Sequence, residues 1–145
     1  MIRTPAAPAV ATLAAAASAG AVSFTSPSGN IDCMAYSDAG RPVADCLVQK
    51  AAWPNARARP SNCPLAWFPT EVTLERGRVG VGVCRGDIGP MCPPQGGSRC
   101  RVLRYGASVR VAGMRCTSTR AGVTCRLRNG AGRGFRVARE GYRRF

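Results

Sequence analysis

The feature that most constrains this chain is a set of eight cysteines in 145 residues that contain no histidine. Zinc sites usually take closely spaced cysteine pairs or add histidine ligands. Neither arrangement occurs, so the even number of cysteines predicts four disulfides, and we expect no metal and no other cofactor. Disulfides persist in oxidising compartments, which indicates a protein that works outside the cytoplasm. The cysteines are Cys33, Cys46, Cys63, Cys84, Cys92, Cys100, Cys116 and Cys125.

The segments between the cysteines predict how they pair. Two intervals have a turn signal at their midpoint, at 39–40 and at 120–122. A hairpin that turns there places its flanking cysteines opposite each other across antiparallel strands. A third interval holds a Pro- and Gly-rich loop at 93–97, which is typical of a local clasp. The predicted pairs are Cys33–Cys46, Cys116–Cys125, Cys92–Cys100 and, as the pair left over, Cys63–Cys84.

The N-terminal residues have the order of a secretory signal peptide. A positive charge at Arg3 precedes a short alanine-rich run at 9–17 and the small residues at 18–21. We therefore expect a cleavable signal at 1–21, cut after Ala19 or Ala21, and one exported domain at 22–145. The apolar run is shorter than the roughly 20 residues that span a bilayer, so no transmembrane segment is predicted. The alternative interpretations are a disordered alanine-rich tail and a misassigned start of the chain.

Short segments of alternating polarity, separated by Gly, Pro, Asn or Asp, run through the rest of the chain. This pattern predicts a mainly β fold, a small antiparallel sandwich or barrel crosslinked by disulfides. The prolines between 51 and 70 predict a largely irregular connection, anchored by Trp53 and Trp67, which we expect to be buried rather than to stack on a ligand. The predicted strands are 22–24, 31–36, 43–48, 72–74, 79–84, 107–111, 114–117, 123–127 and 135–138.

Basic residues gather in the last third of the chain. Residues 20–98 hold seven basic and six acidic side chains, whereas residues 99–145 hold thirteen arginines and one acid, Glu140. Alternation along 123–128 places the arginines on the face opposite the apolar side chains, and the other predicted strands of this region alternate in the same way. If these strands are neighbours, they form a cationic sheet face. The candidate anion-binding residues are Arg110, Arg126, Arg128, Arg133, Arg136 and Arg139, with Arg143 and Arg144 nearby.

A cationic face suits an anionic partner. The candidates are an anionic envelope polymer, a lipid headgroup or a protein. Nucleic acid is a poor candidate, because the chain is expected to be exported and shows no recognition motif for DNA or RNA. The alternative is a solvated surface that reflects codon usage, since the chain has twenty arginines and one lysine.

Catalytic patterns are largely absent from the sequence. Without histidine no Ser-His-Asp or Cys-His pair can form, and cysteines in disulfides do not act as thiolates. We therefore predict an exported, non-catalytic binding module with no catalytic residue. Two alternatives stay open: an inhibitor of a hydrolase that presents the Cys92–Cys100 loop, and a small hydrolase with paired carboxylates. The carboxylates, of which spacing selects no pair, are Asp32, Asp38, Asp45, Glu71, Glu75, Asp87 and Glu140.

Several short motifs follow one another along the chain. They are FTSPSGNIDC at 24–33, VCRGD at 83–87, CTS at 116–118, GVTC at 122–125, and GF at 134–135 with REGYR at 139–143. In this order they resemble an uncharacterised family of small secreted actinobacterial proteins. The resemblance implies export and six framework cysteines, with Cys92 and Cys100 as an added pair, and it implies no activity. Arg133 stands where the family pattern leads us to expect histidine.

Overall fold

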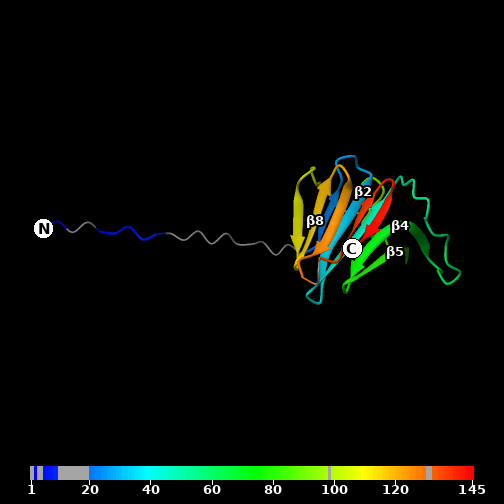
Figure 1. Ribbon diagram of the computed structural model, residues 1–145, viewed down its shortest axis with the longest axis horizontal. Helices are drawn as coiled ribbons and strands as arrows, with labels where there is room; N and C mark the ends of the chain where they lie inside the picture. The colour runs from blue at the N-terminus through cyan, green and yellow to red at the C-terminus, as the bar shows by residue number, and fades with distance from the viewer. Residues whose placement is uncertain (1, 3–4, 10–19, 98, 130–131) are drawn as a thin grey trace.

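The computed structural model describes residues 2, 5–9, 20–97, 99–129 and 132–145. Within these ranges the chain forms eleven β-strands and no helix (Figure 1). The described residues therefore contain no helix long and apolar enough to cross a membrane. Most of the apolar run of the predicted signal peptide lies outside the described residues. The strands run from Val22 to Arg144.

The first sheet has six strands in the order β5-β4-β3-β2-β1-β6. All neighbours are antiparallel except β1 and β6, which run parallel. The strands are β1 (Val22–Thr25), β2 (Ile31–Asp38), β3 (Arg41–Val48), β4 (Ala66–Glu75), β5 (Arg78–Arg85) and β6 (Arg101–Val102).

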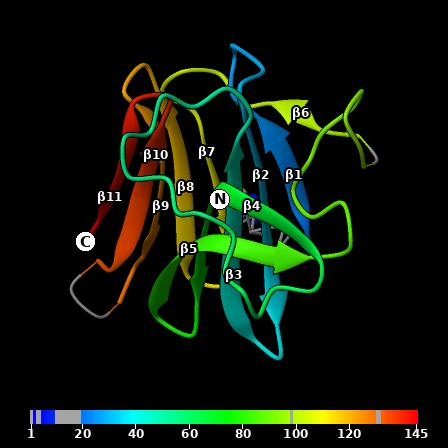
Figure 2. The ribbon, with the colours of Figure 1, turned by 90° about the vertical axis from the view of Figure 1, so that its right-hand side faces the viewer.

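The second sheet is an antiparallel meander of five strands in the order β11-β10-β9-β8-β7. Its strands are β7 (Ser108–Val111), β8 (Met114–Thr119), β9 (Gly122–Leu127), β10 (Gly134–Ala138) and β11 (Gly141–Arg144). The two sheets pack face to face, as Figures 1 and 2 show, so the predicted sandwich is confirmed.

Three hairpins turn on two residues whose second member is glycine. The turns are Ala39-Gly40, Arg76-Gly77 and Ala112-Gly113, and both residues of each have positive φ, between 47° and 79°. Such paired left-handed residues match the twist of the flanking strands and fix their register. The register in turn decides which side chains meet on each sheet face.

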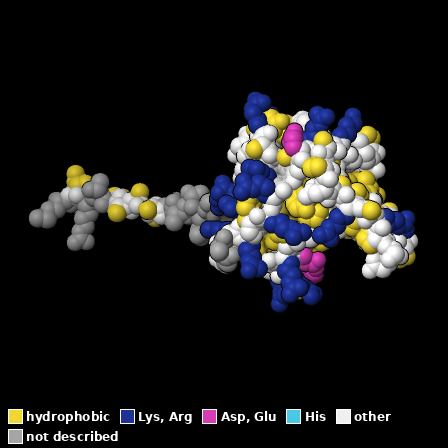
Figure 3. Space-filling view, turned by 45° about the vertical axis from the view of Figure 1, so that its right-hand side comes forward, with side chains coloured by type: hydrophobic (Ala, Val, Ile, Leu, Met, Phe, Trp, Pro, Cys, Tyr) yellow, Lys and Arg dark blue, Asp and Glu magenta, His cyan; other side chains and the backbone are white. Residues whose placement is uncertain are grey.

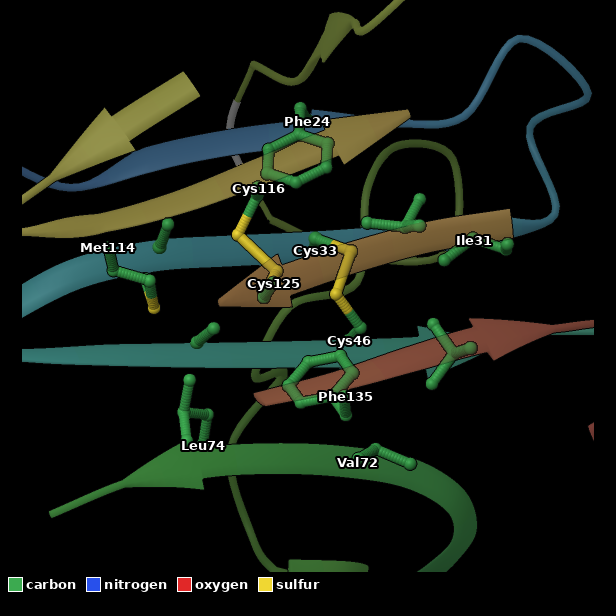
Figure 4. Packing of buried hydrophobic residues seen from close by; sticks show 14 of the residues in the cluster. Phe24, Ile31, Cys33, Cys46, Val72, Leu74, Met114, Cys116, Cys125 and Phe135 are labelled. Atoms are coloured by element: carbon green, nitrogen blue, oxygen red, sulfur yellow. A yellow bond between two sulfur atoms is a disulfide. The ribbon is translucent and has the colours of Figure 1, made fainter. Parts of the chain in front are cut away.

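The apolar side chains of both sheets meet between the layers. Phe24 and Phe135 are fully buried there, on either side of two disulfides that lie close together at the centre (Figure 4). One of these disulfides belongs to each sheet, because Cys33 pairs with Cys46 across β2 and β3, and Cys116 pairs with Cys125 across β8 and β9. The four disulfides join the pairs expected from the sequence: Cys33–Cys46, Cys63–Cys84, Cys92–Cys100 and Cys116–Cys125.

The predicted irregular connection ends earlier than expected. Strand β4 begins at Ala66, so the prediction is wrong for residues 66–70. The pairing of β4 with β5 is interrupted between Phe68 and Val72, and Pro69 lies in that interruption. A proline at such an irregularity removes no ladder hydrogen bond, which is why a strand accommodates it. The short strands β6 and β11 were also not predicted.

The two tryptophans differ in burial. Trp53 is 7% exposed, and its indole N–H donates to the carbonyl oxygen of Ala138 at 2.8 Å. Its ring packs on Tyr142 with the ring centroids 5.0 Å apart, so it fastens the connection to the second sheet. Trp67 is half-buried against Gly82, where any side chain would collide with the indole. The predicted burial is therefore confirmed for Trp53 and only in part for Trp67.

Candidate functional site

On the outer face of the second sheet, each strand contributes one arginine to a row that we call the arginine face. On β7 to β10 these arginines alternate with core-facing residues, as in β7, where Val109 and Val111 are buried and Arg110 is exposed. On β11 the register with β10 places Arg143 on the same face. Basic side chains also far outnumber acidic ones on the side of the molecule shown in Figure 3. The residues of the arginine face are Arg110, Arg115, Arg126, Arg136 and Arg143.

The strand register places these arginines directly opposite one another. Arg115 pairs with Arg110 on one side and with Arg126 on the other, and Arg136 pairs with Arg143. Directly opposed residues have Cβ atoms about 4.5–5.5 Å apart, and like charges in that position destabilise a sheet. Among the described residues the only ion pairs are those of Arg85, which lies elsewhere. The positive charge of the arginine face is therefore not balanced by the protein itself.

The remaining surface of the arginine face is polar. Ser108 and Thr117 are cross-strand partners whose hydroxyl oxygens lie 2.7 Å apart, and Arg115 Nε donates to the Ser108 hydroxyl at 3.2 Å. Phe145, at the edge, is 38% exposed, and the guanidinium of Arg126 lies 4.2 Å from its ring centroid. The face thus offers guanidinium and hydroxyl groups with little apolar surface between them.

The structure brings together three of the six candidate residues, Arg110, Arg126 and Arg136. Arg128 follows the end of β9, and its backbone N–H donates to Gly113. Arg133 lies beside Gly77, to whose carbonyl its guanidinium donates at 3.4 Å. Arg139 lies in the turn between β10 and β11.

Two arginines of the face were absent from the candidates. Arg115 alternates with the buried Met114 and Cys116, a signal that was available in the sequence. Arg143 was expected only near the candidate residues, because β11 carries too few apolar residues to be recognised as a strand. The register with β10 is what brings it opposite Arg136.

A second charged cluster lies on the outer face of the first sheet. Glu71 is 1% exposed and forms an ion pair with Arg85, whose Nη2 lies 2.8 Å from Oε2. The guanidinium of Arg85 also lies 3.7 Å from the ring centroid of Phe68. Burial raises the pKa of Asp45 to about 7; the negative charge of Glu71 adds to the rise and Arg85 opposes it. Burial likewise raises the pKa of Glu71, against the hydrogen bond from Arg85.

This cluster does not offer the two accessible carboxylates that glycoside hydrolysis requires. Glu71 is bound by Arg85 and is almost completely buried, so no substrate reaches it. What the cluster does is hold a proton on Asp45 up to neutral pH. Its effect is therefore expected on stability rather than on chemistry.

Asp45→Asn is expected to stabilise the fold by about 2 kcal/mol at pH 8 and to change little at pH 4. The pKa of Asp45 is raised to about 7 in the folded chain. The unfolded state therefore releases this proton first, and stability falls as pH rises from about 4 to about 7. Each pKa unit corresponds to about 1.4 kcal/mol, and partial solvent access of the carboxyl reduces the full value.

Urea unfolding at both pH values measures this difference. Asp38→Asn is the matched control, because Asp38 is exposed beside the first hairpin turn. We expect the control to be neutral at either pH. Equal effects of Asp45→Asn at pH 4 and pH 8 would show that the pKa of this carboxyl is not raised in the folded chain.

The loop between β5 and β6 is fastened to the first sheet by a buried carboxylate. Asp32 is 2% exposed and accepts hydrogen bonds from Thr25 Oγ1 at 2.8 Å, Gln49 Nε2 at 2.7 Å and the Cys92 N–H at 3.0 Å. The Cys92–Cys100 disulfide closes the same loop, on which Ile88 is 49% exposed. The loop is therefore anchored at Cys92 and presents the apolar side chain of Ile88 to solvent.

One family model matches this chain over residues 7–145, and its description is a family of unknown function, DUF6636. The match covers all eleven strands and all eight cysteines. No curated protein and no solved structure matches the chain. The comparisons thus agree with the resemblance to an uncharacterised family, and they assign no activity.

Proposed function

The chain belongs to this family of unknown function, and we propose from its surface that it is an exported, non-catalytic module that binds an anionic polymer through the arginine face. The observation that carries the proposal is the set of directly opposed arginine pairs, whose members form no ion pair with a carboxylate among the described residues. Guanidinium groups form strong paired hydrogen bonds with carboxylates and phosphates. A polymer with regularly spaced acid groups would bridge opposed arginines and relieve their repulsion.

The chemistry of the arginine face favours a polymer over a lipid surface. Proteins that lie in a bilayer interface insert apolar side chains beside their basic ones. On this face Phe145 is the large apolar side chain, and Arg126 covers its ring. Single-stranded nucleic acid also fits poorly, because its binding sites stack bases on exposed aromatic rings. A carboxylated or phosphorylated polysaccharide needs only charge and hydroxyl contacts, which the face supplies.

The compartment follows from the covalent framework and the N-terminal pattern. Four disulfides in a small domain are typical of oxidising, extracellular surroundings. The order of residues at 1–21 adds a signal for export. We therefore propose that the protein acts in the cell envelope or outside the cell, where acidic polymers are accessible partners.

The test reverses the charge of two arginines that together take part in all the opposed pairs. Arg115→Glu with Arg136→Glu turns all three like-charge pairs into pairs of opposite charge. We expect the affinity of the oxidised protein for polygalacturonate or inorganic polyphosphate to fall about 100-fold at low salt, with a shallower salt dependence. Stability should be unchanged or slightly higher, because opposite charges stabilise cross-strand pairs.

Arg41→Glu with Arg57→Glu is the matched control, because it changes the net charge equally at exposed sites off the face. It should reduce binding far less than the reversal on the face. Equal losses for the two variants would mean that overall charge, and not the arginine face, holds the polymer. Anionic vesicles serve as a second probe, and tighter binding to vesicles than to both polymers would contradict a polymer partner.

The second candidate function is inhibition of a hydrolase by the loop between β5 and β6. The anchoring of this loop by Asp32 and by the Cys92–Cys100 disulfide favours it, because a preorganised loop loses little entropy on binding. Deleting residues 94–96 should abolish inhibition in that case and leave polymer binding intact. Polymer binding that is lost with this deletion would contradict the placement of the site on the arginine face.

A further inference from the structure

One end of the arginine face is hollowed. The cross-strand pair of Ala138 and Gly141 forms the floor next to the pair of Arg136 and Arg143. Because these floor residues are small, the taller side chains around them border an open hollow of about 280 Å³. We call this space the Glu140 hollow; it is lined by Ala121, Arg136, Ala138, Glu140, Gly141, Tyr142 and Arg143.

The two arginines of the hollow are suited to one acid group. Arg136 and Arg143 are direct cross-strand partners, so their side chains leave the sheet next to each other on the same face. A carboxylate or phosphate between them can accept hydrogen bonds from both planar groups. Such a bridging acid also removes the repulsion between the pair.

Glu140 gives the hollow a second kind of group. It is the single acid among residues 99–145, it is exposed, and within the described ranges it forms neither an ion pair nor a side-chain hydrogen bond. An unpaired carboxylate accepts hydrogen bonds only, and it repels a ligand that carries nothing but negative charge. The preferred ligand therefore has both an acid group and hydroxyl donors.

The size of the hollow limits how much of a ligand it holds. Pockets that bury a whole drug-sized molecule measure roughly 300–1,000 Å³. The Glu140 hollow is slightly smaller, and it is continuous with the arginine face through Arg136 and Arg143. These dimensions suit one ring of a polymer whose other units lie along the sheet.

We infer that the Glu140 hollow binds one acidic sugar unit of the polymer. Arg136 and Arg143 donate hydrogen bonds to its acid group, and Glu140 accepts hydrogen bonds from its hydroxyl groups. This inference rests on the proposed function and specifies its ligand as an anionic polysaccharide. A polymer of phosphate alone lacks hydroxyl donors along its chain. It engages the arginine face without using Glu140.

Filling the hollow tests its role while leaving every charge in place. A Cβ at Gly141 would meet no atom within 4 Å, and its φ lies outside the left-handed region, so Gly141→Leu is expected to fold normally. Its affinity for oligogalacturonate should fall about 10-fold. Its affinity for inorganic polyphosphate should stay within about twofold of the unaltered protein. Unchanged binding of both probes would overturn the inference, whereas equal loss of both would show that the hollow does not discriminate sugars.

Glu140→Gln is expected to change the affinities for the two probes in opposite directions. Loss of a repelling charge should strengthen polyphosphate binding about two- to fivefold. Glutamine has one neutral acceptor oxygen and an NH2 donor in place of two charged acceptor oxygens, so oligogalacturonate binding should weaken by at least the same factor. A rise for both probes would show that Glu140 acts only through its charge, and the inference would be wrong. The reversal of Arg115 and Arg136, tested on polyphosphate, reports separately on the proposed function.

Discussion

Arg85→Met is expected to destabilise the fold by about 3–5 kcal/mol at pH 8, because it leaves a buried carboxylate without its partner. Glu71 is 1% exposed, and Arg85 supplies both its ion pair and a hydrogen bond of 2.9 Å from Nε. Methionine preserves much of the packing on Phe68 and removes the charge. The stability lost in this variant should therefore reflect the missing ion pair of Glu71 rather than a change in side-chain volume.

The pH dependence of this loss identifies its cause. Burial already raises the pKa of Glu71, and removing the opposing Arg85 raises it further. The folded variant then holds a proton that the unfolded chain releases, so its stability falls more steeply with rising pH than that of the unaltered protein. We expect a smaller loss at pH 4 than at pH 8 in urea unfolding.

The double variant Arg85→Met with Glu71→Gln is the decisive control. A neutral amide in place of Glu71 removes the uncompensated charge, so most of the lost stability at pH 8 should return. Replacement of whole buried ion pairs by neutral groups is often close to neutral in other proteins. A double variant as unstable as Arg85→Met alone would mean that the ion pair is not what Arg85 contributes.

Local sequence was enough to predict the hairpins and what they carry. The two-residue turn at 39–40 sets Cys33 opposite Cys46, and the turn signal at 120–122 lies midway between Cys116 and Cys125. Alternation within each strand then placed Arg110, Arg126 and Arg136 on the outward side. Turn geometry and side-chain alternation are encoded within a few residues, which is why these predictions hold.

Features that depend on distant strands were out of reach. Asp45 and Glu71 come together because β3 and β4 pair across a long irregular connection, and no local pattern fixes that register. Arg85 reaches Glu71 only after the interruption between Phe68 and Val72 has shifted the pairing of β4 with β5. The Glu140 hollow likewise combines Ala121, from the turn between β8 and β9, with residues of β10, β11 and the turn between them.

Removing the two central disulfides is expected to cost about 6 kcal/mol, the largest loss among the variants considered. Cys33, Cys46, Cys116 and Cys125 are at most 1% exposed and lie between the sheets (Figure 4). Their bridges close intervals of 13 and 9 residues, and each restricts the unfolded chain by about 3 kcal/mol in the chain-entropy description. Small domains are stable by only about 5–15 kcal/mol, so the variant with four alanines should be largely unfolded at 37 °C.

The Cys92–Cys100 disulfide lies outside the hydrophobic cluster between the sheets, so a comparison with it separates chain entropy from packing in that cluster. Cys92–Cys100 closes an interval of 8 residues, close to the 9 residues of Cys116–Cys125, so the chain-entropy contributions should be nearly equal. The alanine variant of Cys116 and Cys125 should nevertheless lose more stability in urea unfolding, because it also empties space between Phe24 and Phe135. Mass spectrometry of each variant verifies that the remaining disulfides keep their pairing. If both two-alanine variants lose the same amount, the central bridges contribute through chain entropy alone and the core closes around the missing sulfur atoms.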